Sequence, residues 1–274
     1  MNTTFKNTQH ESAFNRQGFI VVNEVLTPRE CTEILHYHAG LTPGLNTGFF
    51  ASQNSPNRQY REAVENFLHP LFEQKIKPLF INHRVLYSQY MVKHSGNNGE
   101  CQLHQDWTYV EEPRYTAVNF WCALTDTDTR NGCLWMAPGS HRLTHYIRGR
   151  NIERASLQEQ PFIRQFLMTP VPLKKGQAVL FNSATLHESR NNLSGTDRIA
   201  AAAMIIPCQA TPIHYMAQTQ GSTNVVQMQA DTPFYTEHCG NEIPANVTPR
   251  AHLIITKRNF TKLELLRCFL SSKF

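Results

Sequence analysis

The sequence predicts a mainly β protein, a double-stranded β-helix (jelly roll) with amino-terminal and flanking helices. From residue 84 onward, short apolar segments typical of strands alternate with turns rich in Gly, Asn, Asp and Ser. Before residue 84, most apolar residues recur at helical spacing instead. Many short strands after a helical amino-terminal part are typical of a double-sheet jelly roll. Because a chain of 274 residues can still form one such unit, we expect a single domain over residues 1–274.

The amino-terminal part is expected to contain one short strand and two helices. The apolar run FIVV at residues 19–22 predicts the strand. Thr27 followed by Glu30 three residues later forms the pattern of a capping box, so a helix begins there and Gly40 ends it. A second helix is expected over residues 61–74, where apolar residues recur near helical spacing.

The strands that follow are short and separated by turns. The last stretch of the chain, residues 259–274, reads as an amphipathic helix, which we expect to pack on the outside of the barrel. The expected strands are residues 84–93, 101–110, 117–124, 133–138, 177–182 and 198–207.

Composition narrows the classes of partner and the compartment. The seven cysteines form no CxxC pair, which is typical of reduced thiols in a cytoplasmic protein. No apolar stretch approaches the ~20 residues of a membrane span, and the amino terminus has no secretory pattern. The formal charge of +5 comes from dispersed Lys and Arg, which disfavours nucleic acid as a partner. An acidic small molecule is the milder inference from that charge.

The run LHQDW at residues 103–107 is the first candidate for chemistry. With 13 histidines and 21 acidic residues, about one His-x-Asp/Glu is expected by chance, so the pattern alone is weak evidence. In a strand, however, side chains two residues apart project from the same face. His104 and Asp106 would then both reach one metal ion, although they could also be a hydrogen-bonded pair on the surface.

A third ligand has to come from elsewhere in the chain, because the facial triad of non-haem iron consists of two histidines and one carboxylate. His187 is expected at the end of a strand. Arg198, eleven residues later, opens the next strand, which the turn NNLSGTD would fold back beside the first. The planar guanidinium suits paired recognition of a carboxylate. Arg198 could equally be a surface salt-bridge residue, and only its spacing from His187 argues otherwise.

At this point the sequence resembles the phytanoyl-CoA dioxygenase-like branch of the iron(II)/2-oxoglutarate oxygenases. The resemblance is carried by LHQDW, by NGCLWMAPGSHR at residues 131–142 and by LHESRNNLSGTDR at residues 186–198, with a weaker match in GFIVVNEVLT. It covers residues 13–206 approximately. The order and spacing of these motifs are more specific than any one of them.

The resemblance implies a set of site residues. Arg198 would pair with the far carboxylate of 2-oxoglutarate with the help of the Ser189 hydroxyl, and Trp121 would form an aromatic wall beside this co-substrate. Ser189 could instead cap a turn, and Trp121 could be a core residue. Gln89 shares a strand face with Tyr87 and Met91, and would contact the near carboxylate or the substrate if that face points inward. The implied iron ligands are His104, Asp106 and His187.

The activity implied is a dioxygenase reaction that uses Fe(II), 2-oxoglutarate and O2 and releases succinate and CO2. Hydroxylation of an unactivated C–H bond of a small-molecule metabolite is the default outcome. Desaturation, cyclisation or demethylation in natural-product biosynthesis would start from the same site. Two competing classes remain: a non-oxidative metal-dependent enzyme on a cupin-like barrel, with zinc or manganese on the same ligands, and a non-catalytic binding protein.

Two polar segments with aromatic residues are expected to be loops that form a lid over the substrate. These are residues 42–58, with Phe49 and Phe50, and residues 207–245, with Tyr215, Phe234 and Tyr235. Residues 207–274, which follow the signature region, would then consist of this second lid loop and the terminal helix. Neither segment shows a dedicated nucleotide site for a CoA thioester.

Overall fold

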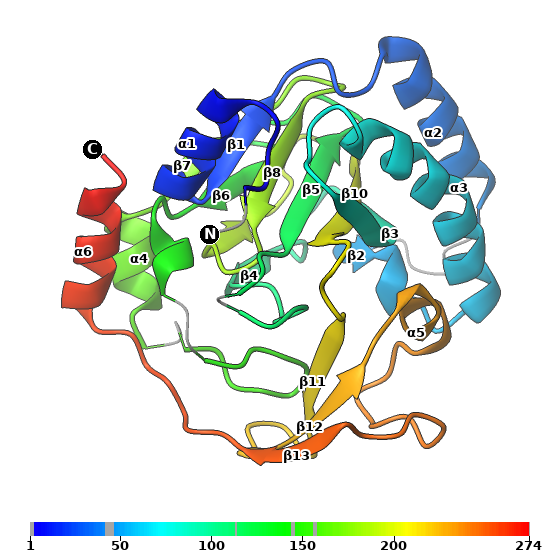
Figure 1. Cartoon of the computed structure of the whole chain (residues 1–274). Coiled ribbons are helices and arrows are strands. Elements are labelled where there is room, and N and C mark those ends of the chain that lie inside the picture. The colour runs from blue at the N-terminus through cyan, green and yellow to red at the C-terminus, as the bar shows by residue number, and fades with distance from the viewer. Residues whose placement is uncertain (1–2, 42–46, 113, 144–145, 156–157, 274) are drawn as a thin grey trace.

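The computed structural model describes the chain except residues 1–2, 42–46, 113, 144–145, 156–157 and 274. Two antiparallel sheets form its centre (Figure 1). The larger sheet has the strand order β1-β8-β5-β10-β3-β2 and the smaller one has the order β4-β9-β6-β7. The bounds in the larger sheet are β1 Phe19–Val22, β2 Phe49–Ala51, β3 His83–Lys93, β5 Val118–Ala123, β8 Ala178–Asn182 and β10 Arg198–Pro207. Those in the smaller sheet are β4 Cys101–His104, β6 Leu134–Met136, β7 Thr169–Val171 and β9 His187–Ser189.

Apolar side chains fill the space between the two sheets. Trp121, Val179 and Ala200 from the larger sheet form one buried cluster with Leu134 and Met136 from the smaller sheet. Two facing antiparallel sheets around a shared core are the architecture of a jelly roll. The predicted double-stranded β-helix is therefore confirmed.

Three amino-terminal helices accompany the larger sheet: α1 (Thr8–Gln17), α2 (Pro28–Gly40) and α3 (Arg58–Ile76). In Figure 1, α2 and α3 lie beside one face of this sheet, and their buried residues join its outward apolar side chains in one core. Thr27 and Glu30 form the expected capping box, and α2 ends at Gly40. Helix α3 begins before the predicted residue 61 because the side chain of Asn57 accepts a hydrogen bond from the amide of Tyr60. Helix α1 was not predicted.

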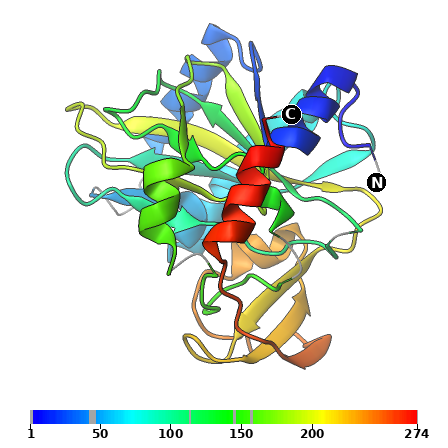
Figure 2. The ribbon, with the colours of Figure 1, turned by 90° about the vertical axis from the view of Figure 1, so that its left-hand side faces the viewer.

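Residues 207–245 are not one continuous loop, which corrects that part of the prediction. They contain β11 (Ile213–Ala217), β12 (Asn224–Gln229) and α5 (Thr232–Glu237), and β12 pairs with β11 and with β13 (Ala251–Ile254) in a third antiparallel sheet. Figures 1 and 2 show this sheet at one end of the barrel. The aromatic residues assigned to the lid, Tyr215, Phe234 and Tyr235, are buried in apolar clusters with residues of this sheet. The polar residues that suggested a loop stand at exposed strand positions and turns.

The other predicted loop, residues 42–58, is also partly ordered structure. Residues 42–46 lie outside the described part of the chain. Phe49–Ala51 form β2 at the edge of the larger sheet, and a 3-10 turn, η1 (Ser52–Asn54), follows. Phe50 is buried in the core between helices and sheet. Its burial explains why this segment is held against the barrel.

Two helices support the smaller sheet from outside: α4 (Gln160–Phe166) and the predicted terminal helix α6 (Lys262–Ser271). Leu265 of α6 shares a buried cluster with Leu103 and Leu186. In Figure 2, α4 and α6 stand side by side in front of the barrel. Since Leu103 and Leu186 directly precede His104 and His187, these helices anchor the backbone that carries two candidate ligands. No helix in the described ranges is both long and apolar enough to cross a membrane.

Candidate metal centre

The structure brings His104, Asp106 and His187 together. One ligand atom from each lies within 4.8 Å of the others. The Oδ1 atom of Asp106 is 3.7 Å from Nε2 of His104 and 3.7 Å from Nε2 of His187. The two imidazole rings are 4.2 Å apart between centroids. These three side chains can therefore bind one ion.

The local geometry differs from the sequence prediction in two respects. Strand β4 ends at His104, so Asp106 lies just beyond the strand and not on its face. At this position the backbone amide of Asp106 donates to the carbonyl of Ser183. His187 is the first residue of β9 and pairs directly with His104, whereas the sequence suggested the end of a strand. The convergence therefore comes from strand pairing and from the irregular segment after β4, not from simple alternation within a strand.

Both imidazoles are held in the tautomer that metal binding needs. Nδ1 of His104 is 2.7 Å from the carbonyl of Gln102, and Nδ1 of His187 is 2.9 Å from the carbonyl of Thr185. A carbonyl only accepts, so Nδ1 carries the proton and Nε2 keeps its lone pair. Burial and the neighbouring His187 hold the pKa of His104 well below its usual value, which favours the neutral ring.

Asp106 is oriented by a residue that the sequence analysis did not identify. The side-chain amide of Asn119 donates to Oδ2 of Asp106 at 3.0 Å and leaves Oδ1 toward the histidines. The Nε of Arg148 donates to the backbone carbonyl of Asp106 at 2.7 Å. Asn119 precedes Trp121 by two residues on the same face of β5, so the inward alternation of that strand was the signal that could have found it.

Arg198 is a buried cation without a carboxylate partner. Its side chain is almost fully buried, and Nη1 donates to the carbonyl of Met91 at 3.3 Å. Its Nε is buried and has no hydrogen-bond partner. Within the described ranges, no carboxylate forms an ion pair with Arg198, and none of the residues outside those ranges is an Asp or Glu. Burial lowers the pKa of Arg198 to about 10, so the guanidinium stays charged near neutral pH. A buried charge of this kind requires an anion to offset its desolvation.

The strand that carries Arg198 is not where the sequence placed it. β10 does not fold back beside β9; it lies in the larger sheet between β5 and β3. This position brings the guanidinium carbon of Arg198 to 5.1 Å from the ring centre of Trp121. The structure thus places the two predicted co-substrate residues in contact by a different topology.

Gln89 and Trp121 occupy one row across the larger sheet, because Ala202 of β10 pairs with both. Met91 on the same face of β3 packs against the core between the sheets, so this face points inward. Ser189 is buried in β9 two residues after His187. The contacts of Gln89, Trp121 and Ser189 with a co-substrate stay predictions.

A second buried cation, Lys93, lies opposite Arg198 in the strand register and was missed by the sequence analysis. Its ammonium donates to the carbonyls of Gly99, Ser189 and Arg190 at 2.5, 2.9 and 2.6 Å. Burial, with a smaller contribution from Arg198, lowers the pKa of Lys93 to about 7. Because its three donors are already used, Lys93 holds the backbone around the site, and Arg198 is the cation with free donors.

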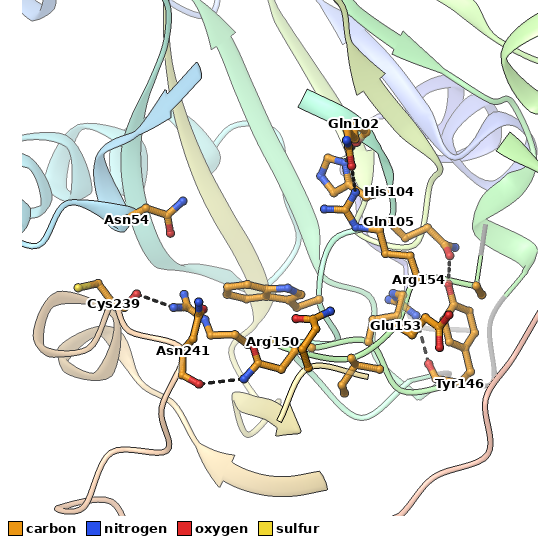
Figure 3. Close-up of a pocket in the computed structure, with 17 residues that line it drawn as sticks. Asn54, Gln102, His104, Gln105, Tyr146, Arg150, Glu153, Arg154, Cys239 and Asn241 are labelled. Carbon is orange, nitrogen blue, oxygen red and sulfur yellow. Dashed lines mark hydrogen bonds between the residues drawn. The ribbon is translucent and has the colours of Figure 1, made fainter. Parts of the chain in front are cut away.

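A cavity of about 710 Å³ opens beside the metal triad (Figure 3). His104 is the one triad member that lines it. The remaining wall comes from Trp107, from the segment 146–155 and from residues of the two predicted lid segments, including Asn54 and Asn241. Both segments therefore contribute to the cavity, although the second also contains two strands and a helix.

Fold and site together define a class: a jelly-roll protein with a two-histidine, one-carboxylate ligand set, as in mononuclear non-haem iron oxygenases. The chain belongs to the phytanoyl-CoA dioxygenase (PhyH) family, whose model matches residues 14–200. This family and the solved structures similar to the chain comprise iron- and 2-oxoglutarate-dependent oxygenases.

Curated relatives support the family assignment. The chain is 31% identical over 163 residues to phytanoyl-CoA dioxygenase domain-containing protein 1 of Danio rerio, covering 52% of this chain and 56% of that protein. It is 32% identical over 125 residues to the phytanoyl-CoA dioxygenase of Arabidopsis thaliana, covering 44% of each. The chain thus spans about half the length of the curated relatives it matches.

Solved structures support the fold. The carbocyclase SnoK from nogalamycin biosynthesis matches with a TM-score of 0.55 and 20% identity, over 75% of this chain and 86% of that one. The epimerase SnoN, solved with Fe3+, alpha ketoglutarate and nogalamycin RO, matches with a TM-score of 0.56 and 19% identity, over 75% and 85%. EctD from S. alaskensis, solved with 2-oxoglutarate and 5-hydroxyectoine, matches with a TM-score of 0.55 and 18% identity, over 75% and 78%.

Proposed function

We propose that this chain is an Fe(II)- and 2-oxoglutarate-dependent dioxygenase that oxidises a C–H bond of a small-molecule metabolite, with hydroxylation as the default outcome. One observation carries the proposal above all. A three-residue metal-binding group and a buried arginine without a carboxylate partner face the same barrel interior. The first suits a divalent ion, and the second suits the free end of an acidic co-substrate bound to that ion.

The two parts of the site are spaced for such a molecule. On the inner face of β5, Asn119 orients Asp106, and Trp121, two residues later, lies against Arg198. Two residues of a strand span about 7 Å, which is comparable with the length of a five-carbon dicarboxylate. This spacing supports 2-oxoglutarate, chelated at the metal by one end and paired with Arg198 at the other.

Each residue then has a distinct role. His104, Asp106 and His187 would hold iron; Arg198 and Ser189 would bind the far carboxylate. Trp121 would close the side of the co-substrate pocket and exclude water. When bound, iron supplies O2 activation, and 2-oxoglutarate supplies the two electrons released as it decarboxylates to succinate and CO2.

The near carboxylate has its own candidate. Gln89 lies in the same row of the sheet as Trp121 and its amide has no protein partner within the described ranges, so it would donate to that carboxylate or to the substrate.

The type of oxidation is the open part of the proposal. Proteins of the same fold are named as a carbocyclase and an epimerase, so the fold alone does not select hydroxylation over cyclisation, desaturation or demethylation. A non-oxidative enzyme with zinc or manganese on the same ligands would have no use for the unpaired guanidinium of Arg198. The outcome depends on how the cavity orients the substrate relative to the metal.

An anaerobic titration tests the proposal. Fe(II) and 2-oxoglutarate together should give the protein a weak metal-to-ligand absorption band in the visible, and admission of O2 should then yield succinate. His104→Ala, Asp106→Ala and His187→Ala should each abolish succinate formation, because each removes one of three protein ligands. Zinc-only binding, or a variant with near wild-type turnover, would contradict the assignment.

A further inference from the structure

The cavity beside His104 carries an excess of positive charge that the protein does not neutralise. Its charged lining residues are three arginines and one glutamate. Arg148 is paired with Glu112 through two contacts, at 2.8 and 3.1 Å. Glu153 is paired with Lys257 at 2.8 Å. Two cations, Arg150 and Arg154, are left without an opposite charge.

No carboxylate in the described ranges pairs with Arg150 or Arg154, and the positions outside those ranges are neither Asp nor Glu. The remaining lining residues are polar or apolar but uncharged at neutral pH. The cavity therefore has a net positive potential, which attracts anions.

Arg150 is held in place by neutral groups. Its guanidinium carbon lies 4.9 Å from the ring centre of Trp107, and Nη1 donates to the carbonyls of Cys239, at 2.5 Å, and of Gly240. Figure 3 shows this contact on the side of the cavity formed by Cys239 and Asn241. Within the described ranges Nε and Nη2 make no hydrogen bond, so an edge with two donors is oriented in advance and still free.

Arg154 stands on the opposite side, next to the metal centre. Figure 3 shows its side chain beside His104 and Gln102. Its closest acceptors, Oε1 of Gln102 and the carbonyl of Leu103, are both 3.5 Å from Nη1, at the outer limit of a hydrogen bond. Its head is exposed and weakly held, so an anion could recruit it at little cost.

We propose that this cavity binds a substrate that carries a carboxylate or phosphate group, with Arg150 and Arg154 as the residues that recognise it. The inference rests on the proposed function, because the cavity is taken to be the substrate site beside the metal. A volume of about 710 Å³ suits a metabolite-sized molecule. The anion is not 2-oxoglutarate itself, since Arg198 does not line this cavity and lies in the barrel interior.

The test uses simple probes on the Fe(II)- and 2-oxoglutarate-loaded protein under anaerobic conditions. Linear monocarboxylates, monoalkyl phosphates and primary amides of matched chain length are titrated by calorimetry into wild type, Arg150→Gln, Arg154→Gln and the double variant. Arg267→Gln is the matched control, because Arg267 is an exposed arginine of α6 that does not line the cavity. The dissociation constant of 2-oxoglutarate is measured in each variant.

We expect the acids or the phosphates to bind more tightly than the amides, and the better of the two identifies the anionic group. Each Arg→Gln change should weaken anion binding about 10- to 100-fold, the effect of losing a hydrogen bond to a charged group. Arg267→Gln should leave anion binding unchanged. The dissociation constant of 2-oxoglutarate should be the same in all variants as in the wild type. Equal binding of acids and amides, binding by neither, or equal affinity in the double variant and wild type would overturn the inference. If the proposed function were wrong, the wild-type protein itself would not bind 2-oxoglutarate.

Discussion

Replacing Arg198 with lysine separates the charge of the proposed co-substrate anchor from its geometry. Lysine keeps a positive charge but presents a single ammonium in place of two parallel donors. The change also removes the contact of the guanidinium with Trp121, which lies 5.1 Å away. We therefore expect Arg198→Lys to weaken 2-oxoglutarate binding while the metal triad remains intact.

The magnitude follows from the lost interaction. One hydrogen bond between charged groups contributes about 1.5–3 kcal/mol, which corresponds to roughly a 10- to 100-fold higher dissociation constant for 2-oxoglutarate. Burial would add a pH dependence. Lys93, the register partner of Arg198, already has its pKa lowered to about 7, and a lysine at 198 would meet similar burial and a neighbouring cation.

The sign of that pH dependence is defined. As the pH rises through the lowered pKa, a lysine at 198 loses its proton and the anchor loses its charge, so the variant binds 2-oxoglutarate more weakly at higher pH. The wild-type guanidinium, with a pKa of about 10, stays charged from about pH 6 to about pH 9. Wild-type affinity should therefore change less with pH than that of the variant over the same range.

The assay is anaerobic titration of the Fe(II)-loaded protein with 2-oxoglutarate, followed by the visible absorption band at several pH values. Iron affinity is measured separately, and Arg267→Lys controls for the exchange of one arginine. A variant with unchanged 2-oxoglutarate affinity at every pH would show that the carboxylate binds elsewhere. A loss explained entirely by weaker iron binding would also refute the reasoning.

Three further predictions address the support of the site, the core and the cavity wall. Asn119→Ala leaves Asp106 without its orienting donor and should lower iron affinity about 10- to 100-fold in an iron titration; unchanged affinity would contradict that role. Phe72→Ala empties a fully buried position between α3 and the larger sheet and should lower the free energy of unfolding by about 3–5 kcal/mol in urea, without changing 2-oxoglutarate affinity in the folded protein. Substrate should protect the cavity-lining parts of residues 42–58 and 207–245, at Asn54 and around Cys239 and Asn241, from limited proteolysis, and protection confined to the terminal helix would refute their role in the cavity wall.

Much of the fold was predictable because local patterns decided it. The capping box at Thr27 and Glu30 marks the start of α2, and long apolar runs such as residues 198–207 mark buried strands. Prediction failed where polar residues interrupt or flank a short element. In β12 (Asn224–Gln229), buried Val225, Val226 and Met228 stand among polar residues, and only pairing with two neighbouring strands shows that they form a sheet.

The grouping of the three candidate ligands has a different structural basis from the predicted one. The structure brings His104 and Asp106 together with His187, but Asp106 lies beyond the end of β4, in the irregular segment that follows. The supporting residues Asn119 and Lys93 were not predicted. Their roles depend on which strands become neighbours, and a single sequence does not show this.

The two proposed anion sites differ in how far the sequence predicts them: Arg198 was a candidate from the sequence, whereas Arg150 and Arg154 were not. Arg198 belongs to a long strand whose register with β3 places it opposite Lys93, so strand pairing sets its position. Arg150 and Arg154 lie in an irregular segment, and their charge matters only because Arg148 and Glu153 find partners at Glu112 and Lys257. An unneutralised pair of cations is a property of the assembled cavity, because it emerges only after every other charge has been paired. On the proposed assignments, substrate recognition depends on long-range charge pairing, whereas co-substrate recognition depends on strand register.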